Sequence, residues 1–379
     1  MTETAILDRP LGRSLFATLA PQAPDALLGL IRLFQADHRM GKIDLGVGVF
    51  RDEAGATPVM GAVKQAEARL LAEQSSKTYL GPEGDSEFVE RLAQFVMGDD
   101  AARSGRLTGV QTPGGTGALR LGAALIARAR PGVTIWTGSP TWPNHAPIFH
   151  EAGLAVWPHR FFDRETSAVD FAGMISDLGQ AKAGDVVLLH GCCQNPTGAQ
   201  LSSDQWMQIA QLCTERGITP FIDLAYHGLG DGLDRDAVST RLMLATLPDA
   251  LVAYSCDKNF GLYRDRVGAL WVQSDNADIA QAAQGNLLSI TRSLWSMPPD
   301  HGAAVVRIIL ATQDLRANWL TELEAMRLRL NSLRTALAAA HPALTAIDTQ
   351  RGMFALLPIT AEAVIALRLP LRGRAFYND

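Results

Sequence analysis

The sequence predicts an α/β fold in which a mostly parallel seven-stranded sheet is flanked by helices. Short apolar runs rich in β-branched residues alternate with longer helical patterns, which is typical of parallel sheets. The chain has 379 residues, of which 47% are hydrophobic and 19% charged, so it can bury a full core. The expected strands are residues 107–111, 133–137, 154–157, 186–190, 219–222, 251–254 and 269–272.

Three helical patterns between and after these strands are long enough to predict individually. They cover residues 117–130, 204–216 and 314–340. The last one has leucines at three- and four-residue spacing, which gives the helix one apolar face. We expect this face to be buried.

Both flanks of the chain break the alternation of strands and helices. The N-terminal part is rich in loops apart from a short helix near residues 26–34, and the C-terminal part is mostly helical. We expect a smaller α/β domain built from both chain ends. Residues 1–56 would form an N-terminal arm and the first part of this domain, residues 57–308 the large ligand-binding domain, and residues 309–379 the rest of the small domain.

Composition and charge argue against several classes of partner. The 34 Lys and Arg against 39 Asp and Glu give a net charge of −5, and no basic run suits nucleic acid. No apolar stretch approaches the ~18 residues of a membrane span, and the first residues do not resemble a signal peptide. The four cysteines lack a C-x-x-C spacing, so we expect reduced thiols and no metal site. These features predict a cytoplasmic protein that binds a small molecule, with no nucleic acid or membrane partner.

Polar motifs follow the predicted strands, where ligands of open α/β sheets bind. After the first strand, Gly115 and Thr116 open a helix, where backbone N–H groups and a hydroxyl can hold a phosphate. A plain tight turn would also explain these glycines. Arg120 stands where the last glycine of G-x-G-x-x-G would fall, which argues against a dinucleotide site.

Four further residues each have a structural and a functional interpretation. Trp142 could cover the sheet edge or stack on a planar ring, and Asn195 could cap its own turn or bind a ligand oxygen. Asp223 could cap a helix or pair with a protonated ring nitrogen. Lys258 could be solvated or, if desolvated, a nucleophilic amine. Together with the phosphate cradle, these residues predict a site for pyridoxal 5'-phosphate.

The motifs that carry these residues resemble the class I pyridoxal-phosphate-dependent aminotransferases, the aspartate and aromatic amino acid group. The motifs are PGGTGALR, SPTWPNH, CCQNPTG, DLAYHG and SCDKNFGLYRDRVG, with IDLGVGVFRD, KTYLG and RSLWSMPP besides. The match extends from about Phe16 through Arg368. The resemblance implies the pyridoxal-phosphate transferase fold of type I and a homodimer with shared active sites.

The resemblance also implies a role for each residue around the cofactor ring. Lys258 would bind the cofactor covalently and later move a proton, and Asp223 would keep the pyridine nitrogen protonated. Asn195 and Tyr226 would hydrogen-bond the phenolic oxygen, and Trp142 would stack on the ring. Lys258, Asp223 and Tyr226 are therefore the expected catalytic residues.

The same resemblance assigns further residues to the cofactor phosphate and to the surroundings of Asp223. His145 would lie behind the ring carboxylate and orient it. The expected phosphate-binding residues are Gly115, Thr116, Ser255 and Arg266, together with Tyr79 from the neighbouring subunit.

For the substrate, the resemblance implies Gly48, Trp142, Asn195 and Arg292, the last binding a distal carboxylate across the dimer interface. A site that also accepts aromatic side chains must avoid burying Arg292 unpaired, and Met297 would let the pocket repack. We therefore expect transfer of the amino group of tyrosine or phenylalanine to 2-oxoglutarate or oxaloacetate. The alternatives are an aspartate aminotransferase, a pyridoxal lyase or decarboxylase, and a cofactor-binding member that is catalytically impaired.

Three departures from the family pattern matter. Asp257 stands where the family commonly has a small hydroxyl residue, and its carboxylate is expected to raise the pKa of the neighbouring lysine. Gln194 replaces a histidine, with little effect expected. After Arg368 the family's Gly-Arg-x-Asn-x-Ala-Gly segment, whose arginine binds the substrate α-carboxylate, is missing, and Arg374 is not assigned that role. From this we expect a truncated tail and poor transamination.

Overall fold

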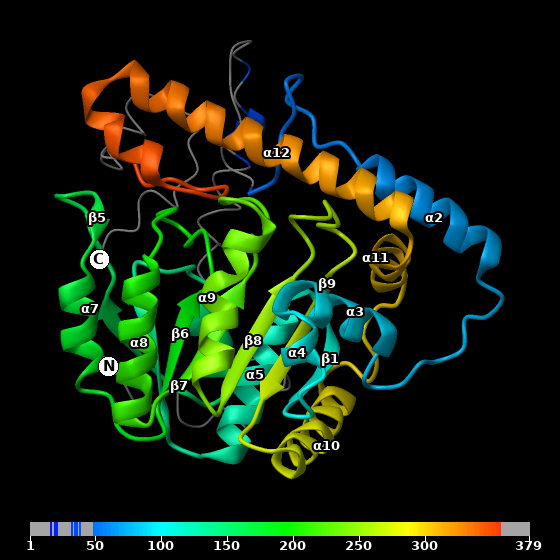
Figure 1. Cartoon of the computed structure of the whole chain (residues 1–379), viewed down its shortest axis with the longest axis horizontal. Helices are drawn as coiled ribbons and strands as arrows, with labels where there is room; N and C mark the ends of the chain where they lie inside the picture. Colours follow the sequence, from blue (N-terminus) through cyan, green and yellow to red (C-terminus); the bar gives the residue numbers. More distant parts are fainter. Residues whose placement is uncertain are drawn as a thin grey trace, which may run out of the picture. The chain divides into compact units, whose positions relative to one another are not determined.

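Seven strands form one mostly parallel sheet in the computed structural model of the chain (Figure 1). The strands are β1 (Leu107–Pro113), β2 (Thr134–Ser139), β3 (Ala155–Arg160), β6 (Val186–His190), β7 (Thr219–Leu224), β8 (Ala250–Ser255) and β9 (Val267–Gln273). Their order is β1-β9-β8-β7-β6-β2-β3, and β9 is antiparallel to both of its neighbours, β1 and β8, whereas the other neighbouring pairs are parallel. The predicted sheet is confirmed, with all seven strands close to their expected positions.

The structure describes residues 48–357, together with residues 16, 19–21, 32, 34–36 and 38. The chain divides into two compact units, residues 1–47 with 360–376 and residues 48–359 with 377–379. The sheet belongs to the second unit. The short helix expected near residues 26–34 lies mostly outside the described residues, as do the ending after Arg368 and Arg374. The domain boundaries drawn from the sequence stay predictions.

Helices pack around this sheet and extend beyond it. They are α2 (Gly61–Glu73), α3 (Ser86–Met97), α4 (Asp99–Ala102), α5 (Gly114–Ala129), α6 (His145–Glu151), α7 (Phe171–Leu178), α8 (Ser203–Arg216), α9 (Leu233–Thr246), α10 (Ala277–Leu294), α11 (His301–Ala311), α12 (Gln313–Ala340) and the 3₁₀ helix η1 (Pro342–Thr349). A small hairpin, β4 (Phe162–Asp163) with β5 (Ala168–Val169), lies apart from the main sheet. The three helices predicted individually are confirmed as α5, α8 and α12, but the apolar face of α12 is buried only in part, because Leu333 and Leu337 near its end are exposed.

Helix α5 packs on the sheet, and its first turn borders the candidate site. It contacts β1, β8 and β9, and a β-carbon at Gly122 would lie only 2.4 Å from the Phe221 ring. The glycine thus lets the helix approach the sheet closely, and Leu121, Phe221 and Leu270 share the core around it. This packing fixes how α5 lies against the sheet.

Helix α8 shows how local sequence sets its ends. Ser202 accepts a hydrogen bond from the Gln205 N–H at 3.2 Å, and the Gln205 side chain accepts one from the Ser202 N–H at 2.8 Å. This capping box pairs two backbone donors that the helix leaves free. Gly217, in the left-handed conformation with φ 66°, ends the helix.

Helix α12 packs against the segment that follows β8. The Trp319 ring stacks on Phe260 at 4.3 Å between centroids, and Trp319 Nε1 donates to the Asn259 carbonyl at 2.8 Å. Trp319 and Phe260 are both fully buried. The turn that carries Lys258 is therefore held from behind by packing rather than left as a loose loop.

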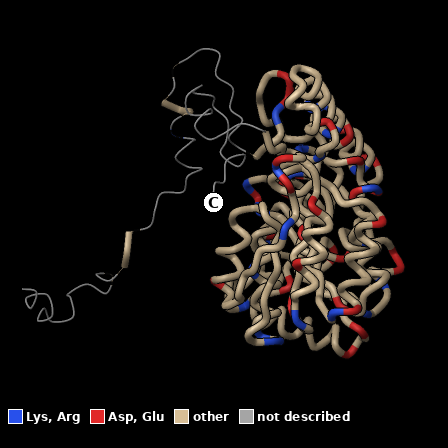
Figure 2. Tube along the Cα trace, turned by 90° about the vertical axis from the view of Figure 1, so that its left-hand side faces the viewer, with Lys and Arg blue, Asp and Glu red and all other residues tan. Residues whose placement is uncertain are grey.

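Two findings in the described part of the chain concern the membrane and cysteine predictions. No helix in it has both the length and the apolar character that crossing a bilayer requires. Figure 2 shows acidic and basic residues interspersed along the trace. Cys192, Cys193, Cys213 and Cys256 are all free and buried, as the reduced-thiol prediction requires.

Candidate active site

The predicted site residues gather where three neighbouring parallel strands end. Asn195 follows β6, Asp223 lies at the end of β7, and Lys258 lies in the turn after β8. Strands β6, β7 and β8 are adjacent in the sheet and run parallel. Their carboxyl ends therefore meet at one edge, which brings together residues that are far apart in the sequence.

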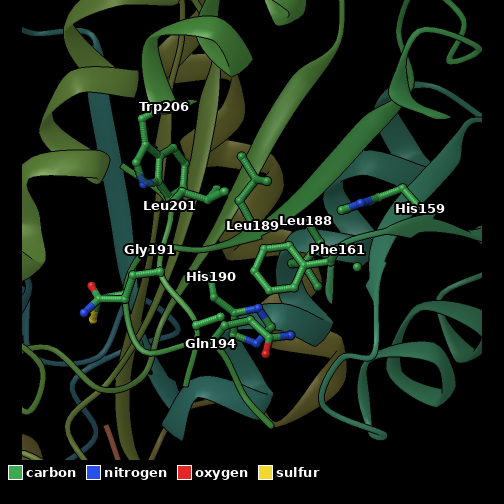
Figure 3. A pocket seen from close by; sticks show the side chains of 13 residues that line it. His159, Phe161, Leu188, Leu189, His190, Gly191, Gln194, Leu201 and Trp206 are labelled. Carbon is green, nitrogen blue, oxygen red and sulfur yellow. The ribbon is translucent and has the colours of Figure 1, made fainter. Parts of the chain in front are cut away.

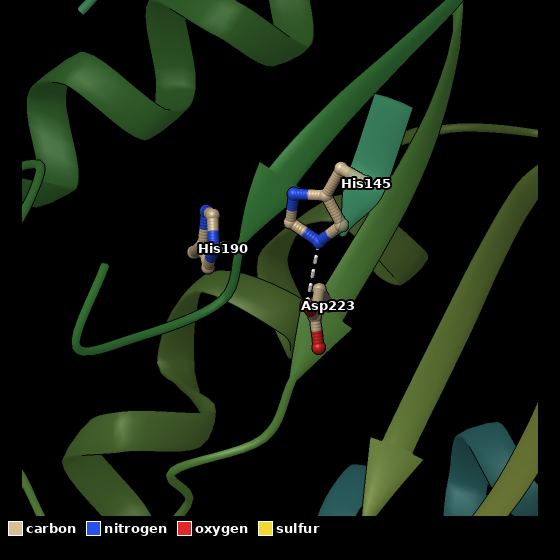
Figure 4. A group of neighbouring side chains, drawn as sticks. All are labelled: His145, His190 and Asp223. Atoms are coloured by element: carbon tan, nitrogen blue, oxygen red, sulfur yellow. Dashed lines mark hydrogen bonds and ion pairs between the residues drawn. The ribbon is translucent and has the colours of Figure 1, made fainter. Parts of the chain in front are cut away.

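Asp223 is held by a chain of hydrogen bonds (Figure 4). Its carboxylate is 6% exposed and lies 3.1 Å from His145 Nε2, while His145 Nδ1 lies 2.8 Å from the Thr141 hydroxyl. The His190 ring packs beside this pair, 5.3 Å from the His145 ring. The arrangement fixes one carboxylate oxygen of Asp223 against an imidazole that is itself oriented.

The environment sets the ionisation of these groups. Burial by itself would raise the pKa of Asp223, but the hydrogen bond from His145 and the charges of His145, His190 and Lys258 bring it below its ordinary value. Burial lowers the pKa of His190 to about 4, and the charge of His145 acts in the same direction. At neutral pH Asp223 is thus an anion in a buried place, suited to a cationic ring nitrogen.

Asn195 and Tyr226 form a second polar pair near the lysine. Asn195 Nδ2 donates to the Tyr226 hydroxyl at 3.1 Å, and both residues are 4% exposed. Asn195 Oδ1 is buried and has no hydrogen-bond partner among the residues that the structure describes. Lys258 is half-buried, and its Nζ lies 5.5 Å from the centroid of the Tyr226 ring. Burying an amide oxygen without a hydrogen bond costs free energy, so a further polar group beside this pair would be stabilising.

The start of α5 forms a cradle with Ser255 and Arg266. A β-carbon at Gly114, where φ is +71°, would lie 2.5 Å from Arg266 Nη2, and one at Gly115 would lie 3.1 Å from the Ser255 side chain. The glycines therefore allow the backbone to approach both side chains. Thr116 stands in the first turn, where backbone N–H groups and the helix dipole favour an anion.

Asp257 also lies in this cradle. The sequence alone showed only that it is next to Lys258. Its buried carboxylate forms an ion pair with Arg266 Nη1. Burial raises the pKa of Asp257, while the charges of Lys258 and Arg266 oppose that effect. The pKa that it was expected to raise in Lys258 stays a prediction.

Trp142 and Gly48, which were expected to bind the substrate, contact the site through other residues. The Trp142 ring lies 5.2 Å from the His145 ring in an edge-on arrangement, which places it beside the Asp223 chain. A β-carbon at Gly48 would lie 2.7 Å from the Phe354 ring, and Phe354 meets the Tyr226 ring at 6.0 Å. Gly48 thus borders the site through Phe354.

Tyr79 and Arg292 are placed differently from the other expected residues. Tyr79 is 92% exposed, and Arg292 is exposed near the end of α10, where it hydrogen-bonds the Ser296 hydroxyl. Leu80 N–H contacts Met297 Sδ at 3.2 Å, so the segments of Tyr79 and Arg292 are neighbours. Within residues 48–357, no hydrogen bond or ring contact connects either side chain with Asp223, Asn195 or Arg266.

Gln194 connects two segments of the site by hydrogen bonds that its position in the sequence did not predict. Its amide Nε2 donates to the Pro140 carbonyl at 2.7 Å, and its Oε1 accepts from the Thr197 N–H at 3.0 Å and from the Thr197 hydroxyl. Gln194 thereby fixes the turn that presents Asn195 and ties it to the loop before Trp142. Its place next to the Asn-Pro turn was the available signal.

A small cavity lies behind the site (Figure 3). It has a volume of about 30 Å³ and is lined in part by His159, His190, Gln194 and Trp206. The Nε2 atoms of His159 and His190 are buried, and within residues 48–357 neither has a hydrogen-bond partner. Burial lowers the pKa of His159 as well. A water molecule needs roughly 10–15 Å³, so the cavity is large enough for one.

Comparison with known proteins gives consistent results. The sequence profile of "Aminotransferase class I and II" matches residues 40–375. The tyrosine aminotransferase of Rhizobium meliloti (strain 1021) is 52% identical over 370 residues, 95% of each chain. The aspartate aminotransferase of Escherichia coli (strain K12) is 41% identical over 362 residues, 93% of this chain and 91% of the other. An aromatic-amino-acid aminotransferase from Burkholderia pseudomallei, solved covalently bound to pyridoxal phosphate, superposes with a TM-score of 0.91 at 35% identity, covering 96% and 93% of the two chains.

Proposed function

Because the chain belongs to the class I and II aminotransferases, we propose that it transfers the amino group of tyrosine or phenylalanine to 2-oxoglutarate or oxaloacetate, using pyridoxal 5'-phosphate. The observation that carries the proposal is the placement of an amine, Lys258, and a buried carboxylate, Asp223, at the ends of adjacent parallel strands. The identity to a tyrosine aminotransferase favours aromatic substrates.

The residues present fit this cofactor at both of its ends. At the ring, the buried Asp223 anion suits a protonated pyridine nitrogen, and the second N–H of the Asn195 amide, whose Nδ2 already donates to the Tyr226 hydroxyl, suits the phenolic oxygen. At the phosphate, Gly115, Thr116, Ser255 and Arg266 would supply N–H, hydroxyl and guanidinium donors. When bound, pyridoxal phosphate supplies a ring that takes up the electron pair left on the substrate α-carbon.

The protein residues would bind, orient and move protons around that ring. Asp223 would hold a proton on the ring nitrogen, and His145 would keep Asp223 ionised and oriented. Lys258 Nζ would take the proton from the substrate α-carbon as a general base and return it as an acid. The Tyr226 hydroxyl, held by Asn195, would stabilise negative charge on the phenolic oxygen.

Trp142 and Gly48 would shape the space for the substrate. The half-buried Trp142 indole, set edge-on to His145, would cover one face of the ring. Gly48 and Phe354 would close the opposite border near Tyr226. Apolar rings on these borders support an aromatic substrate.

We further propose a homodimer in which Tyr79 and Arg292 serve the partner's site. Both side chains are exposed on neighbouring segments, and no described contact brings them to the residues at the ends of β6 and β7. Arg292 would bind the distal carboxylate of the oxo acid, which is the feature that favours dicarboxylates as one of the two substrates.

A half-reaction test separates these possibilities. The chain loaded with pyridoxal phosphate is mixed with tyrosine, phenylalanine or aspartate in the absence of an oxo acid, and the cofactor absorption and keto acid product are followed. The proposal expects stoichiometric keto acid from each aromatic substrate, with a higher second-order rate constant for this half-reaction than with aspartate. Faster turnover of aspartate would instead make the chain an aspartate aminotransferase, and a spectrum that no amino acid changes would contradict both.

A further inference from the structure

Asp257 brings a negative charge into the cradle at the start of α5. Its carboxylate is 3% exposed and is paired with Arg266, whose side chain is 41% exposed. The other carboxylate oxygen accepts a hydrogen bond from the Val267 N–H at 3.3 Å. The acid is thus fixed by two partners rather than free to turn away.

The carboxylate and the guanidinium face the same stretch of backbone. A β-carbon at Gly114 would lie 2.5 Å from Arg266 Nη2 and 3.2 Å from Asp257 Oδ2. The Asp257 N–H donates to the Ser255 hydroxyl at 3.2 Å, so that hydroxyl also contacts the acid's own backbone. Ser255, Arg266 and Gly114 are therefore all shared between Asp257 and any anion that binds at this helix start.

The positive charges near Asp257 are too few to neutralise both its carboxylate and a bound phosphate. The cations whose charges act on Asp257 among the described residues are Lys258 and Arg266. Lys258 is the amine that the proposed function commits to the cofactor aldehyde. A phosphate monoester carries a charge of about −1.5 to −2 at pH 7, so Arg266 would face a phosphate and a buried carboxylate together. Two like charges at such a short range repel strongly in a partly buried place.

We propose that Asp257 competes with the cofactor phosphate for Arg266 and thereby weakens the hold of this chain on pyridoxal phosphate. The inference rests on the proposed function, because it concerns the phosphate end of that same site. Pyridoxal has the same ring and aldehyde but no phosphate. Its binding should therefore be indifferent to the competition, which separates an effect at the phosphate from an effect on Lys258.

The experiment compares the two ligands on three chains. Cofactor-free wild type, Asp257→Ser and Asp257→Asn are titrated with pyridoxal phosphate and with pyridoxal, and the Kd is taken from the absorption band and from quenching of tryptophan fluorescence. Both variants should bind pyridoxal phosphate about tenfold or more tightly than wild type. Their Kd for pyridoxal should change less than about threefold. Asp204→Ser, which removes an exposed acid in the first turn of α8, should leave both constants unchanged.

Two outcomes would overturn the inference. Unchanged or weaker binding of pyridoxal phosphate by Asp257→Asn would show that the carboxylate does not oppose the phosphate, and the conservative amide guards against a mere folding defect in the serine variant. Equal tightening for both ligands would place the effect on the lysine instead. Borohydride reduction of the wild-type mixture keeps the two proposals apart: an adduct on Lys258 supports the proposed function whatever Asp257 does, whereas no adduct on any of the three chains contradicts the function and the inference together.

Discussion

The two ends of the candidate site are prepared for a ligand in different ways. At the ring end, Asp223 is fixed by His145, and Asn195 donates to the Tyr226 hydroxyl, so a ligand meets groups that are already oriented. At the phosphate end, Arg266 is already paired with Asp257, so a phosphate must displace or share a partner. Preorganised groups cost little to use, whereas an existing ion pair has to be rearranged. The affinity of the ring end and that of the phosphate end should therefore respond differently to substitution.

The largest effect is expected at Lys258. Substitution Lys258→Ala removes the amine that would bind the aldehyde and move the proton, so the rate of transamination should fall about 10⁴-fold or more. The rate of keto acid formation from phenylalanine measures it. Lys182→Ala, at an exposed lysine, is the matched control and should keep the wild-type rate. Substantial activity in Lys258→Ala would remove the basis of the comparison.

Asp223→Asn tests the ring end more finely. The amide has nearly the same shape but cannot keep a ring nitrogen protonated, so kcat should fall about 10²–10⁴-fold while the ligand still binds. The kcat and KM for phenylalanine check this expectation. His145→Gln should have a smaller effect on kcat, because His145 acts through Asp223. An Asp223→Asn enzyme with wild-type kcat would show that the buried charge is not used.

Arg292→Leu distinguishes the substrates. Loss of a charge-assisted, bidentate contact should lower the second-order rate constant of the half-reaction with aspartate about 100-fold. The same constant for phenylalanine should change less than about threefold. Stopped-flow measurement of both half-reactions gives the two values. Equal losses for both substrates would mean that Arg292 supports the fold or the dimer and does not select carboxylates.

The smallest effect is expected in the pH dependence of stability, from His190 at the ring end. Burial lowers its pKa from 6.5 to about 4, so the folded protein holds it neutral while the unfolded chain takes up a proton below pH 6.5. Its contribution is present above pH 6.5 and is lost as the pH falls toward 4, with a loss of about 2 kcal/mol between pH 7 and pH 5. Urea unfolding of wild type and His190→Asn at pH 7 and pH 5 should show a smaller loss in the variant. The exposed His150→Asn control should keep the wild-type loss.

Much of the sheet could be predicted because buried parallel strands are short apolar runs that stand out in the sequence. The positions of Asn195, Asp223 and Lys258 followed from the ends of those runs. The pairing of Asp257 with Arg266 could not be predicted in the same way. It depends on β9 running antiparallel to β8, with Ser255 opposite Gly268, so that the connection folds back and brings the two side chains together.

Other parts of the site depend on tertiary contacts that local sequence does not reveal. Gln194 resembles any polar turn residue until its bond to the Pro140 carbonyl is seen. Phe354 reaches Tyr226 from a segment more than a hundred residues away, and only its ring contact shows that it borders the site. Tyr79 and Arg292 are exposed in the single chain, so the roles proposed for them rest on the resemblance to the family and not on the contacts that they make.

The most direct test of the account is to locate the amine that binds the cofactor. The chain is incubated with pyridoxal phosphate, reduced with borohydride, digested and mapped by mass spectrometry. We expect one stoichiometric pyridoxyl adduct, on Lys258, and none when phenylalanine is added without an oxo acid before reduction. An adduct spread over several surface lysines, or one that phenylalanine does not prevent, would contradict the account.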